Sequence, residues 1–321
     1  MDYRIGVDLG GTKMLLALAT ADEGEVIRTK KVFTKAAEGP QVILQHLIES
    51  IEEFLSKEGL SFNRLEGVGF CMAGFYDIRS SRIVSSPNLP GWEMFPLEKE
   101  LKERLRLPVI IENDANAAAY GEYIFGAGRG KKNLVNITLG TGIGAGIIAE
   151  GKIYRGSGGF AGEIGHLNVL PNGPLCGCGR CGCLESLSSG SAIEREGRLL
   201  LAESFPLPGA ARDVDAGLTA SHVFAAARDG NKEAIKIVER AAYYLGLALS
   251  FLVNILNPEL IIIGGGLANN GDALFDPVRR YLNEAAIGPS GEMVALVPAE
   301  LGEEAGVRGI LSLLDEFLKG R

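Results

Sequence analysis

The residues best suited to chemistry gather around one cysteine-rich stretch. Residues 176–185 read CGCGRCGCLE, four cysteines in eight residues followed directly by Glu185, and His166 lies ten residues before them. Thiolates with one imidazole form a closed, tetrahedral structural zinc site, whereas a catalytic zinc keeps one position open for water. The sequence therefore predicts a structural zinc site with one surplus thiol, because five candidates compete for four positions: His166, Cys176, Cys178, Cys181 and Cys183.

Two other uses of the cysteines have to be weighed against zinc. Cys178 and Cys181 are spaced as CxxC, which also suits a redox pair. A disulfide framework is disfavoured because five cysteines are an odd number and the start, MDYRIGVDLGG, lacks the layout of a secretory signal. We therefore expect a cytoplasmic protein with reduced thiols.

A second group of polar residues lies in PVIIENDANAAA, residues 108–119, where an apolar strand runs into a helix. Asn113 and Asp114 fall at this junction, where α/β proteins place ligands. Asp114 could orient an attacking hydroxyl in phosphoryl transfer and accept its proton, and a helix N-terminus would keep it ionised. Capping of the helix is the alternative role. Glu163 and His166, three residues apart in a glycine-rich loop, are further polar candidates.

Glycine turns supply candidate anion-binding loops. RIGVDLGGTKMLLALAT, residues 4–20, and NLVNITLGTGIGAGIIAEGKIYRG, residues 133–156, each read as strand, glycine turn and strand. Successive backbone N–H groups in such turns can bind phosphate without net positive charge. GTGIGA, residues 140–145, matches the dinucleotide-binding pattern, but a strand follows where that site needs a helix, and no GxxxxGK[ST] loop occurs. The GGG at 264–266 is a weaker signal of the same kind.

The elements that must position these groups alternate between helix and strand. Helical patterns at 42–59 and 97–107 alternate with strand patterns at 65–74 and 108–114, which predicts an α/β fold. The two hairpins predict two related domains flanking a cleft, with the glycine turns facing it. We expect these domains at 1–113 and 114–304, the second with the zinc loop 166–183, and a C-terminal helix at about 305–321 that packs back on the first.

Composition narrows the class of protein. The 321 residues are 46% hydrophobic and carry a net charge of -8, so a sizeable core is expected, without the basic face that nucleic acid or an anionic membrane requires. The apolar stretch 241–256 contains Asn254 and is shorter than the roughly 18 to 20 residues of a membrane span. We interpret it as a buried helix.

Together these segments resemble the ROK family of sugar kinases, within the actin and hexokinase fold superfamily. The family's motifs occur in its order over nearly the whole chain: DLGGTK at Asp8, ENDANAAA at Glu112, LGTGIGAG at Leu139, GEIGH at Gly162, CGCGRCGCLE at Cys176 and IIIGGGL at Ile261. The resemblance implies two ribonuclease-H-like domains and ATP-dependent phosphorylation of a hexose at its 6-hydroxyl, with glucose as the first candidate. N-acetylmannosamine, N-acetylglucosamine and fructose kinases are the alternatives.

The resemblance also implies roles for single residues, with Asp114 as the general base and Asp8 helping to hold Mg²⁺. The phosphates of ATP would be lined by Gly10, Gly11, Thr12, Lys13, Thr141 and Gly142, and the adenosine by Gly265 and Gly266. The sugar hydroxyls would be bound by Asn88, Asn113, Asp114, Glu163, His166 and Glu185. The zinc ligands would be His166, Cys176, Cys178 and Cys183, which leaves Cys181 as the surplus thiol.

One departure from the family and two rival functions bear on this interpretation. Ala73, Gly74 and Phe75 stand where many relatives have a proline and glycine pair before valine and aspartate, in a wall near the sugar. Sugar-responsive repressors of the family carry a helix-turn-helix before the first hairpin, which here starts at Tyr3. A zinc hydrolase would need an open metal position. We expect a kinase, and a homodimer or homotetramer because relatives often assemble so.

Overall fold

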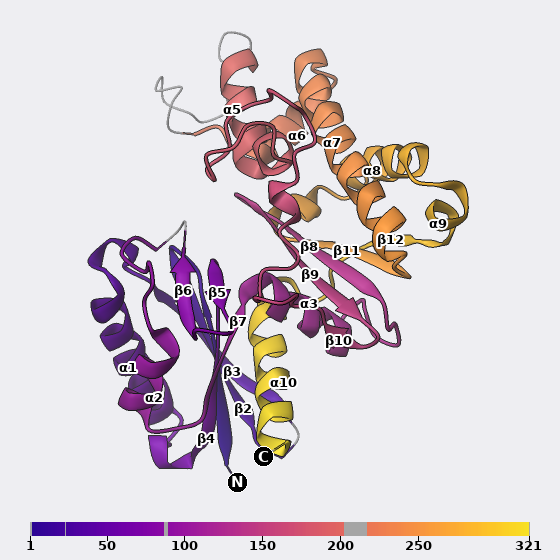
Figure 1. Cartoon of the computed structure of the whole chain (residues 1–321). Coiled ribbons are helices and arrows are strands. Elements are labelled where there is room, and N and C mark those ends of the chain that lie inside the picture. The colour runs from indigo at the N-terminus through magenta and orange to yellow at the C-terminus, as the bar shows by residue number, and fades with distance from the viewer. Residues whose placement is uncertain (1, 23, 87–88, 202–216, 321) are drawn as a thin grey trace. The chain divides into compact units, whose positions relative to one another are not determined.

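The computed structural model describes residues 2–22, 24–86, 89–201 and 217–320 (Figure 1). The chain forms two compact units, the first from residues 1–130, 146–161 and 301–321 and the second from residues 131–145 and 162–300. Both units combine a mixed sheet with helices, so the predicted α/β class is confirmed. The predicted domain limits, 1–113 and 114–304, remain a prediction.

The first unit is built on a five-stranded sheet of order β3-β2-β1-β4-β7. The hairpin predicted around Gly10 and Gly11 is present as the antiparallel pair β1 and β2, and β4 and β7 extend the sheet by parallel pairing. The strands are β1 (Tyr3–Leu9), β2 (Lys13–Thr20), β3 (Val26–Phe33), β4 (Leu65–Met72) and β7 (Val109–Asn113), with a small hairpin of β5 (Phe75–Asp77) and β6 (Arg82–Ser85). The helices are α1 (Pro40–Lys57), α2 (Leu97–Leu105), α3 (Asp114–Phe125) and α10 (Ala305–Lys319), with 3-10 turns at Ala36–Glu38, Phe62–Arg64 and Gly302–Glu304.

Helices cover both faces of this sheet (Figure 1). One face packs against α1 and α2 through a large apolar cluster that includes Ile43, Leu47 and Leu101. The other face packs against α10, and glycines allow the close approach, because a Cβ at Gly69 would lie 2.9 Å from the backbone oxygen of Ile310. Strands β1, β2 and β4 are therefore buried on both sides, whereas the edge strand β3 is largely exposed.

The second sheet repeats the strand order of the first. Its order is β10-β9-β8-β11-β12, again an antiparallel hairpin flanked on one side by two parallel strands. The strands are β8 (Leu134–Leu139), β9 (Ile143–Ala149), β10 (Lys152–Ile153), β11 (Leu260–Gly264) and β12 (Ala295–Pro298). The helices of the second unit are α4 (Glu185–Ser188), α5 (Gly190–Leu201), α6 (Ala220–Arg228), α7 (Lys232–Leu256), α8 (Asp272–Ala285) and α9 (Gly288–Met293), with 3-10 turns at Ile164–His166 and Gly266–Asn270. The prediction of two hairpins of one design is therefore confirmed.

The stretch 241–256 forms the second half of α7, whose first turn is capped by Asn231. Only one face of this helix is buried. Leu245, Leu249 and Val253 lie in the core, whereas Ile255 is 77% exposed, so the interpretation as a buried helix applies to one side of α7. Among the described residues, no helix combines the length and apolar character that crossing a membrane requires.

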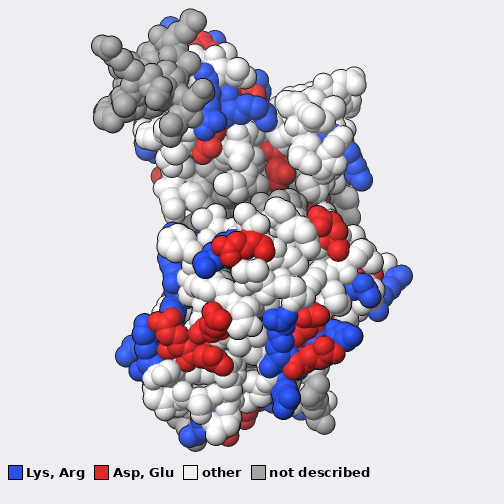
Figure 2. Space-filling model, turned by 90° about the vertical axis from the view of Figure 1, so that its left-hand side faces the viewer, with Lys and Arg blue, Asp and Glu red and all other residues white. Residues whose placement is uncertain are grey.

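Charged side chains of both signs lie among one another on the face of the molecule drawn in Figure 2. Many exposed charges are paired, as Glu53 is with Lys30 and Lys57, each at 2.8 Å. Exposed pairs of this kind contribute little to stability, because solvent and salt screen them.

Candidate functional site

The junction of β7 and α3 carries the first set of polar side chains. Asn113 ends the strand and caps the helix, because its Oδ1 accepts hydrogen bonds from the backbone N–H groups of Ala115 at 2.9 Å and Asn116 at 3.1 Å. Its Nδ2 donates to the backbone oxygen of Gly74 at 3.2 Å. Capping, the alternative role raised from the sequence, is thus present, and it fixes the backbone that carries Asp114.

Asp114 and Asp8 form a pair of carboxylates in the first unit. Burial raises the pKa of Asp114, while the N–H of Ala115, which donates to its Oδ1 at 2.9 Å, acts in the opposite direction. Burial also raises the pKa of Asp8 to about 7, with the negative charge of Asp114 adding to the effect and a hydrogen bond from the Cys71 thiol opposing it. A divalent cation bound at Asp8 would oppose the rise in the pKa of Asp8, because it favours the ionised carboxylate.

The turn between β1 and β2 lies next to Asp8 in sequence. Gly10 donates its N–H to the backbone oxygen of Lys13 at 3.0 Å, and a Cβ on Gly10 would lie 2.9 Å from that oxygen. The hydroxyl of Thr34 fastens the turn by donating to the oxygen of Gly10 at 2.7 Å. Thr12 and Lys13 are exposed at its tip. This geometry leaves the tip accessible, as a phosphate-binding turn requires.

The second unit carries an equivalent turn between β8 and β9. The N–H of Gly140 donates to the oxygen of Gly142 at 3.0 Å, with Thr141 between them. Gly265 follows the neighbouring strand β11 with a φ of +83°, and a Cβ there would lie 2.3 Å from the oxygen of Leu139. The turn and the glycines at 265 and 266 therefore meet at the same end of the sheet, where an α/β sheet binds its ligands.

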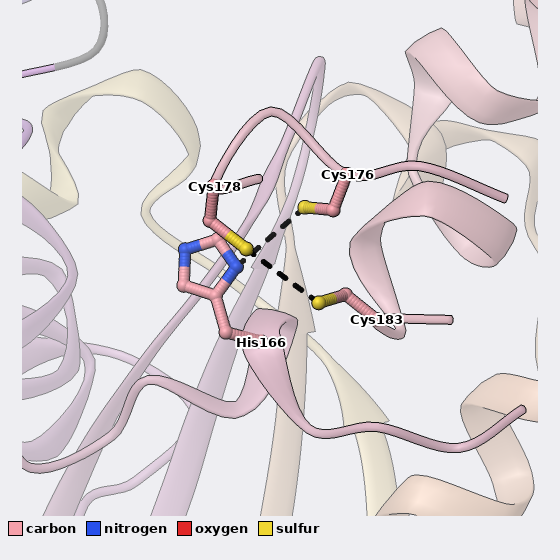
Figure 3. A group of neighbouring side chains, drawn as sticks. All are labelled: His166, Cys176, Cys178 and Cys183. Carbon is pink, nitrogen blue, oxygen red and sulfur yellow. Dashed lines mark hydrogen bonds between the residues drawn. The ribbon is translucent and has the colours of Figure 1, made fainter. Parts of the chain in front are cut away.

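The cysteine loop brings together one imidazole and three thiols (Figure 3). The ligand atoms of His166, Cys176, Cys178 and Cys183 all lie within 4.8 Å of one another. Cys178 Sγ is 3.6 Å from Cys183 Sγ, and Cys176 Sγ is 3.7 Å from His166 Nδ1. Tetrahedral zinc, with bonds of about 2.3 Å to sulfur and 2.0 Å to nitrogen, separates its ligands by about 3.5 to 3.8 Å, so these residues fit the metal.

The fifth candidate, Cys181, does not belong to this group. It is exposed, and its backbone oxygen accepts a hydrogen bond from Asn168 Nδ2 at 2.9 Å. The loop turns sharply beside it at Gly182, which has a φ of +77° and whose Cβ would lie 1.7 Å from the oxygen of Leu170. The thiol of Cys178 faces Cys183 instead of Cys181, so the arrangement favours a metal site over the CxxC redox pair.

Glu185 connects the cysteine loop to the turn between β8 and β9. Its Oε1 lies 3.7 Å from Cys176 Sγ, and its Oε2 accepts a hydrogen bond from the N–H of Ile143 at 2.9 Å. A Cβ on Gly142 would lie 2.5 Å from the same Oε2. The N–H of Gly190 adds a second bond to this turn by donating to the oxygen of Gly140 at 2.8 Å. The carboxylate that follows the last cysteine therefore braces the glycine turn.

Glu163, His166 and Asn88 are the remaining residues that the sequence assigns to the sugar. Glu163 is exposed at the start of the 3-10 turn Ile164–His166 and its backbone oxygen accepts from the N–H of His166 at 3.1 Å. The Nδ1 of His166 faces the sulfur atoms, and its other ring nitrogen lies on the opposite edge (Figure 3). Asn88 lies outside the described residues.

Sequence reasoning gave no role to Glu112 and did not single out Arg155. Glu112, directly before Asn113, is 6% exposed and forms an ion pair with Arg155. Its place in the ENDANAAA motif could have marked Glu112, but nothing in the sequence near Arg155 signals a partner 43 residues away.

This chain is similar to known proteins over nearly its whole length. The model of the ROK family matches residues 4–316. The chain belongs to the ROK family. This member is similar to a glucokinase of Halalkalibacterium halodurans, with 40% identity over 313 residues that cover 96% of this chain and 93% of that protein.

A solved structure and a relative of another class are also similar to this ROK protein. The structure is a ROK family glucokinase from Streptomyces griseus in complex with glucose and AMPPNP, with 36% identity and a TM-score of 0.82 over 97% of this chain and 98% of that one. The relative is a xylose repressor of Bacillus subtilis, 28% identical over 98% of this chain and 78% of the repressor. The two-domain sugar-kinase fold expected from the motifs is thus confirmed.

Proposed function

We propose that this protein is a glucokinase that transfers the γ-phosphoryl group of ATP to the 6-hydroxyl of glucose. The observation that carries the proposal is the similarity over 97% of the chain, at a TM-score of 0.82, to a glucokinase structure that contains glucose and AMPPNP. The 40% identity to the glucokinase of Halalkalibacterium halodurans supports the same reaction.

In the first unit, Asp114 is the proposed general base. Phosphoryl transfer passes through a loose transition state, so the base mainly orients the hydroxyl and accepts its proton late. The raised pKa of Asp114 makes it a better proton acceptor than an exposed aspartate. Asn113 holds the first turn of α3 in place, and we propose that the second hydrogen of its Nδ2 reaches a sugar hydroxyl.

Nucleotide binding is proposed to use both glycine turns. Mg²⁺ held at Asp8 would neutralise charge on the phosphates. Backbone N–H groups in such turns bind phosphate oxygens. We propose that the donors to the phosphates of ATP come from Gly10, Gly11, Thr12, Lys13, Thr141 and Gly142. The flat surface left by Gly265 and Gly266 suits the adenosine, because neither residue has a side chain.

From the second unit, we propose that Glu163, His166 and Glu185 bind sugar hydroxyls. Carboxylates accept strong hydrogen bonds from hydroxyls, and a site built to do so discriminates against ligands that lack them. The Nδ1 of His166 faces the thiols, and we propose that its other ring nitrogen, on the opposite edge, binds a sugar hydroxyl. The zinc bound by His166, Cys176, Cys178 and Cys183 would hold this loop in shape without taking part in the reaction.

A coupled assay of ADP release across a sugar panel tests the proposal. We expect turnover with glucose and ATP, and slower turnover with fructose, N-acetylglucosamine and N-acetylmannosamine. Higher kcat/KM with one of the N-acetylated sugars or with fructose would move the protein to that substrate within the family. Absence of ADP release with every sugar, together with sugar-dependent retention of DNA fragments in a mobility-shift assay, would favour the repressor class represented by the xylose repressor.

A further inference from the structure

We propose that Glu112 and Arg155 are positioning residues for phosphoryl transfer: their ion pair holds the turn that carries Asp114 in its reactive orientation. The inference rests on the proposed function, since it names residues that act through the base of that reaction. Neither residue is assigned a contact with sugar or nucleotide.

Glu112 accepts hydrogen bonds from residues on both sides of Asp114 in the sequence. Oε1 accepts hydrogen bonds from the backbone N–H of Asn113 at 3.0 Å and from Nδ2 of Asn116 at 3.0 Å. Oε2 accepts from Nε of Arg155 at 2.7 Å. One carboxylate therefore connects three parts of the first unit: the residue before Asp114, the first turn of α3 and the segment 146–161. Any rotation of the Asp114 backbone would break at least one of these bonds.

The position requires a carboxylate and not an amide. Three N–H donors converge on Glu112 from Asn113, Asn116 and Arg155, so both side-chain oxygens must act as acceptors. A glutamine offers one acceptor, and its own Nε2 hydrogens would face a donor on one side. Replacement by glutamine thus removes the contact on one side of the turn with almost no change in volume.

Arg155 supplies the charge that makes a buried carboxylate tolerable there. The side chain of Glu112 is 8% exposed and that of Arg155 35%, so the arginine reaches in from a more open position. Glu112, Asp8 and Asp114 are close enough to act together: the pKa of the Cys71 thiol between them is raised well above its usual value, mainly by burial and further by the charges of all three carboxylates. Without Arg155 this acidic group would lack its cation, and repulsion would displace the turn.

A second buried ion pair in the same unit provides a matched control. Arg4 on β1 is 6% exposed and donates to Glu66 at 2.9 Å and to Asp315 at 2.6 Å. It lies near the start of β1, whereas Asp8 lies near the end of the strand. Loss of this pair should destabilise the unit without moving Asp114.

The experiment compares Glu112→Gln, Arg155→Gln and Arg155→Lys with Arg4→Gln in the coupled ADP-release assay, with thermal unfolding measured on each variant. Misplacement of a reacting group by about 1 Å can lower the rate about 100-fold. We therefore expect Glu112→Gln and Arg155→Gln to lower kcat about 10- to 100-fold, with KM for glucose and for ATP changed less than about threefold.

The conservative variant and the control separate positioning from stability. Arg155→Lys keeps a charged donor and should retain kcat within about fivefold of wild type. Arg4→Gln should lower the unfolding temperature at least as much as Glu112→Gln and keep kcat within about twofold. If Glu112→Gln fails to fold, the kcat of Arg155→Gln decides between a positioning role and a purely structural one. The side chain of Arg155 is partly exposed, so its replacement disturbs the core less.

Two results would overturn the inference. An active wild type whose Glu112→Gln and Arg155→Gln variants keep kcat within about twofold would contradict the positioning role alone. A wild type without turnover on any sugar of the panel would overturn the proposed function, and the positioning role with it.

Discussion

The turn at β7 and α3 and the cysteine loop hold their polar residues in opposite ways. The turn joins a strand paired in register with β4 to a capped helix, and hydrogen bonds from Asn113 and Glu112 complete it. The segment from Ile164 to Glu185 contains a short 3-10 turn and isolated bridges, Asn168 with Cys183 and Leu175 with Cys181. One region is held by regular secondary structure, the other by turns and isolated backbone hydrogen bonds around a cluster of potential ligand atoms.

The difference indicates which region would gain more stability from a bound metal. Regular elements keep Asp114 in place by burial and backbone hydrogen bonds, so that region should fold without any ion. The cysteine loop has little apolar burial of its own, and metal binding of about 10 kcal/mol in small zinc domains is large enough to replace it. Changes in one region should therefore leave the properties of the other intact.

Replacement of the base should have the largest effect. Asp114→Asn keeps the volume and the oxygen that accepts from Ala115, but it removes the proton acceptor. We expect kcat to fall about 100- to 10,000-fold, as for loss of a general base, with zinc content unchanged. Because burial raises the pKa of Asp114, the variant should be at least as stable as wild type in thermal unfolding. Near-normal kcat would show that Asp114 is not the base.

Loss of the metal should have the next largest effect, confined to the second region. Cys183→Ser should lose zinc, measured by mass spectrometry of the purified protein, and weaken glucose binding at least tenfold in calorimetry, because His166 and Glu185 lose their support. The matched control Cys181→Ser should keep the metal, because this exposed thiol lies outside the cluster. Zinc loss in the control instead would mean that Cys181 is a ligand.

A smaller effect should follow from disturbing the contact between the loop and the glycine turn. The Cβ introduced by Gly142→Ala would lie 2.5 Å from Glu185 Oε2 and push the carboxylate away from the N–H of Ile143. We expect KM for ATP to rise about tenfold, with zinc retained. Gly140→Ala is the control in the same turn, since its Cβ would meet nothing within 4 Å. Equal effects of both variants would argue against a bracing role of Glu185.

The smallest effect concerns the pH dependence of stability. The pKa of Asp8 is about 7 in the folded protein against 3.8 for the ordinary carboxyl, so the folded state holds this proton over a range where the unfolded state has lost it. Its contribution to the free energy of unfolding is therefore full below about pH 4 and declines as pH rises to about 7, by at most about 1.4 kcal/mol per pH unit. Without Mg²⁺, Asp8→Asn should show a flatter decline in denaturant titrations over this range. An unchanged slope would contradict the shift.

The sequence predicts what depends on neighbours in the chain. The two hairpins, the strand and helix that meet at residue 113, and the cysteine cluster follow from local patterns of apolar residues, glycines and ligand spacing.

What the sequence leaves open depends on contacts between distant residues. No pattern in the nearby sequence predicts that Arg155 contacts Glu112, or that the Oε2 of Glu185 accepts from the N–H of Ile143. Both contacts depend on how loops pack against the sheets. The burial of α7 on one face only is likewise set by tertiary packing, which decides that Ile255 stays exposed in a mostly apolar stretch.

The central claim, transfer of a phosphoryl group to the 6-hydroxyl of glucose, is tested most directly by phosphorus NMR of the product formed from glucose and ATP. A phosphate on the 6-oxygen couples to the two protons of one CH₂ group, so the account predicts a new monoester signal split into a triplet. A doublet, from a phosphate on a ring carbon with one proton, or the absence of any sugar phosphate signal would contradict it.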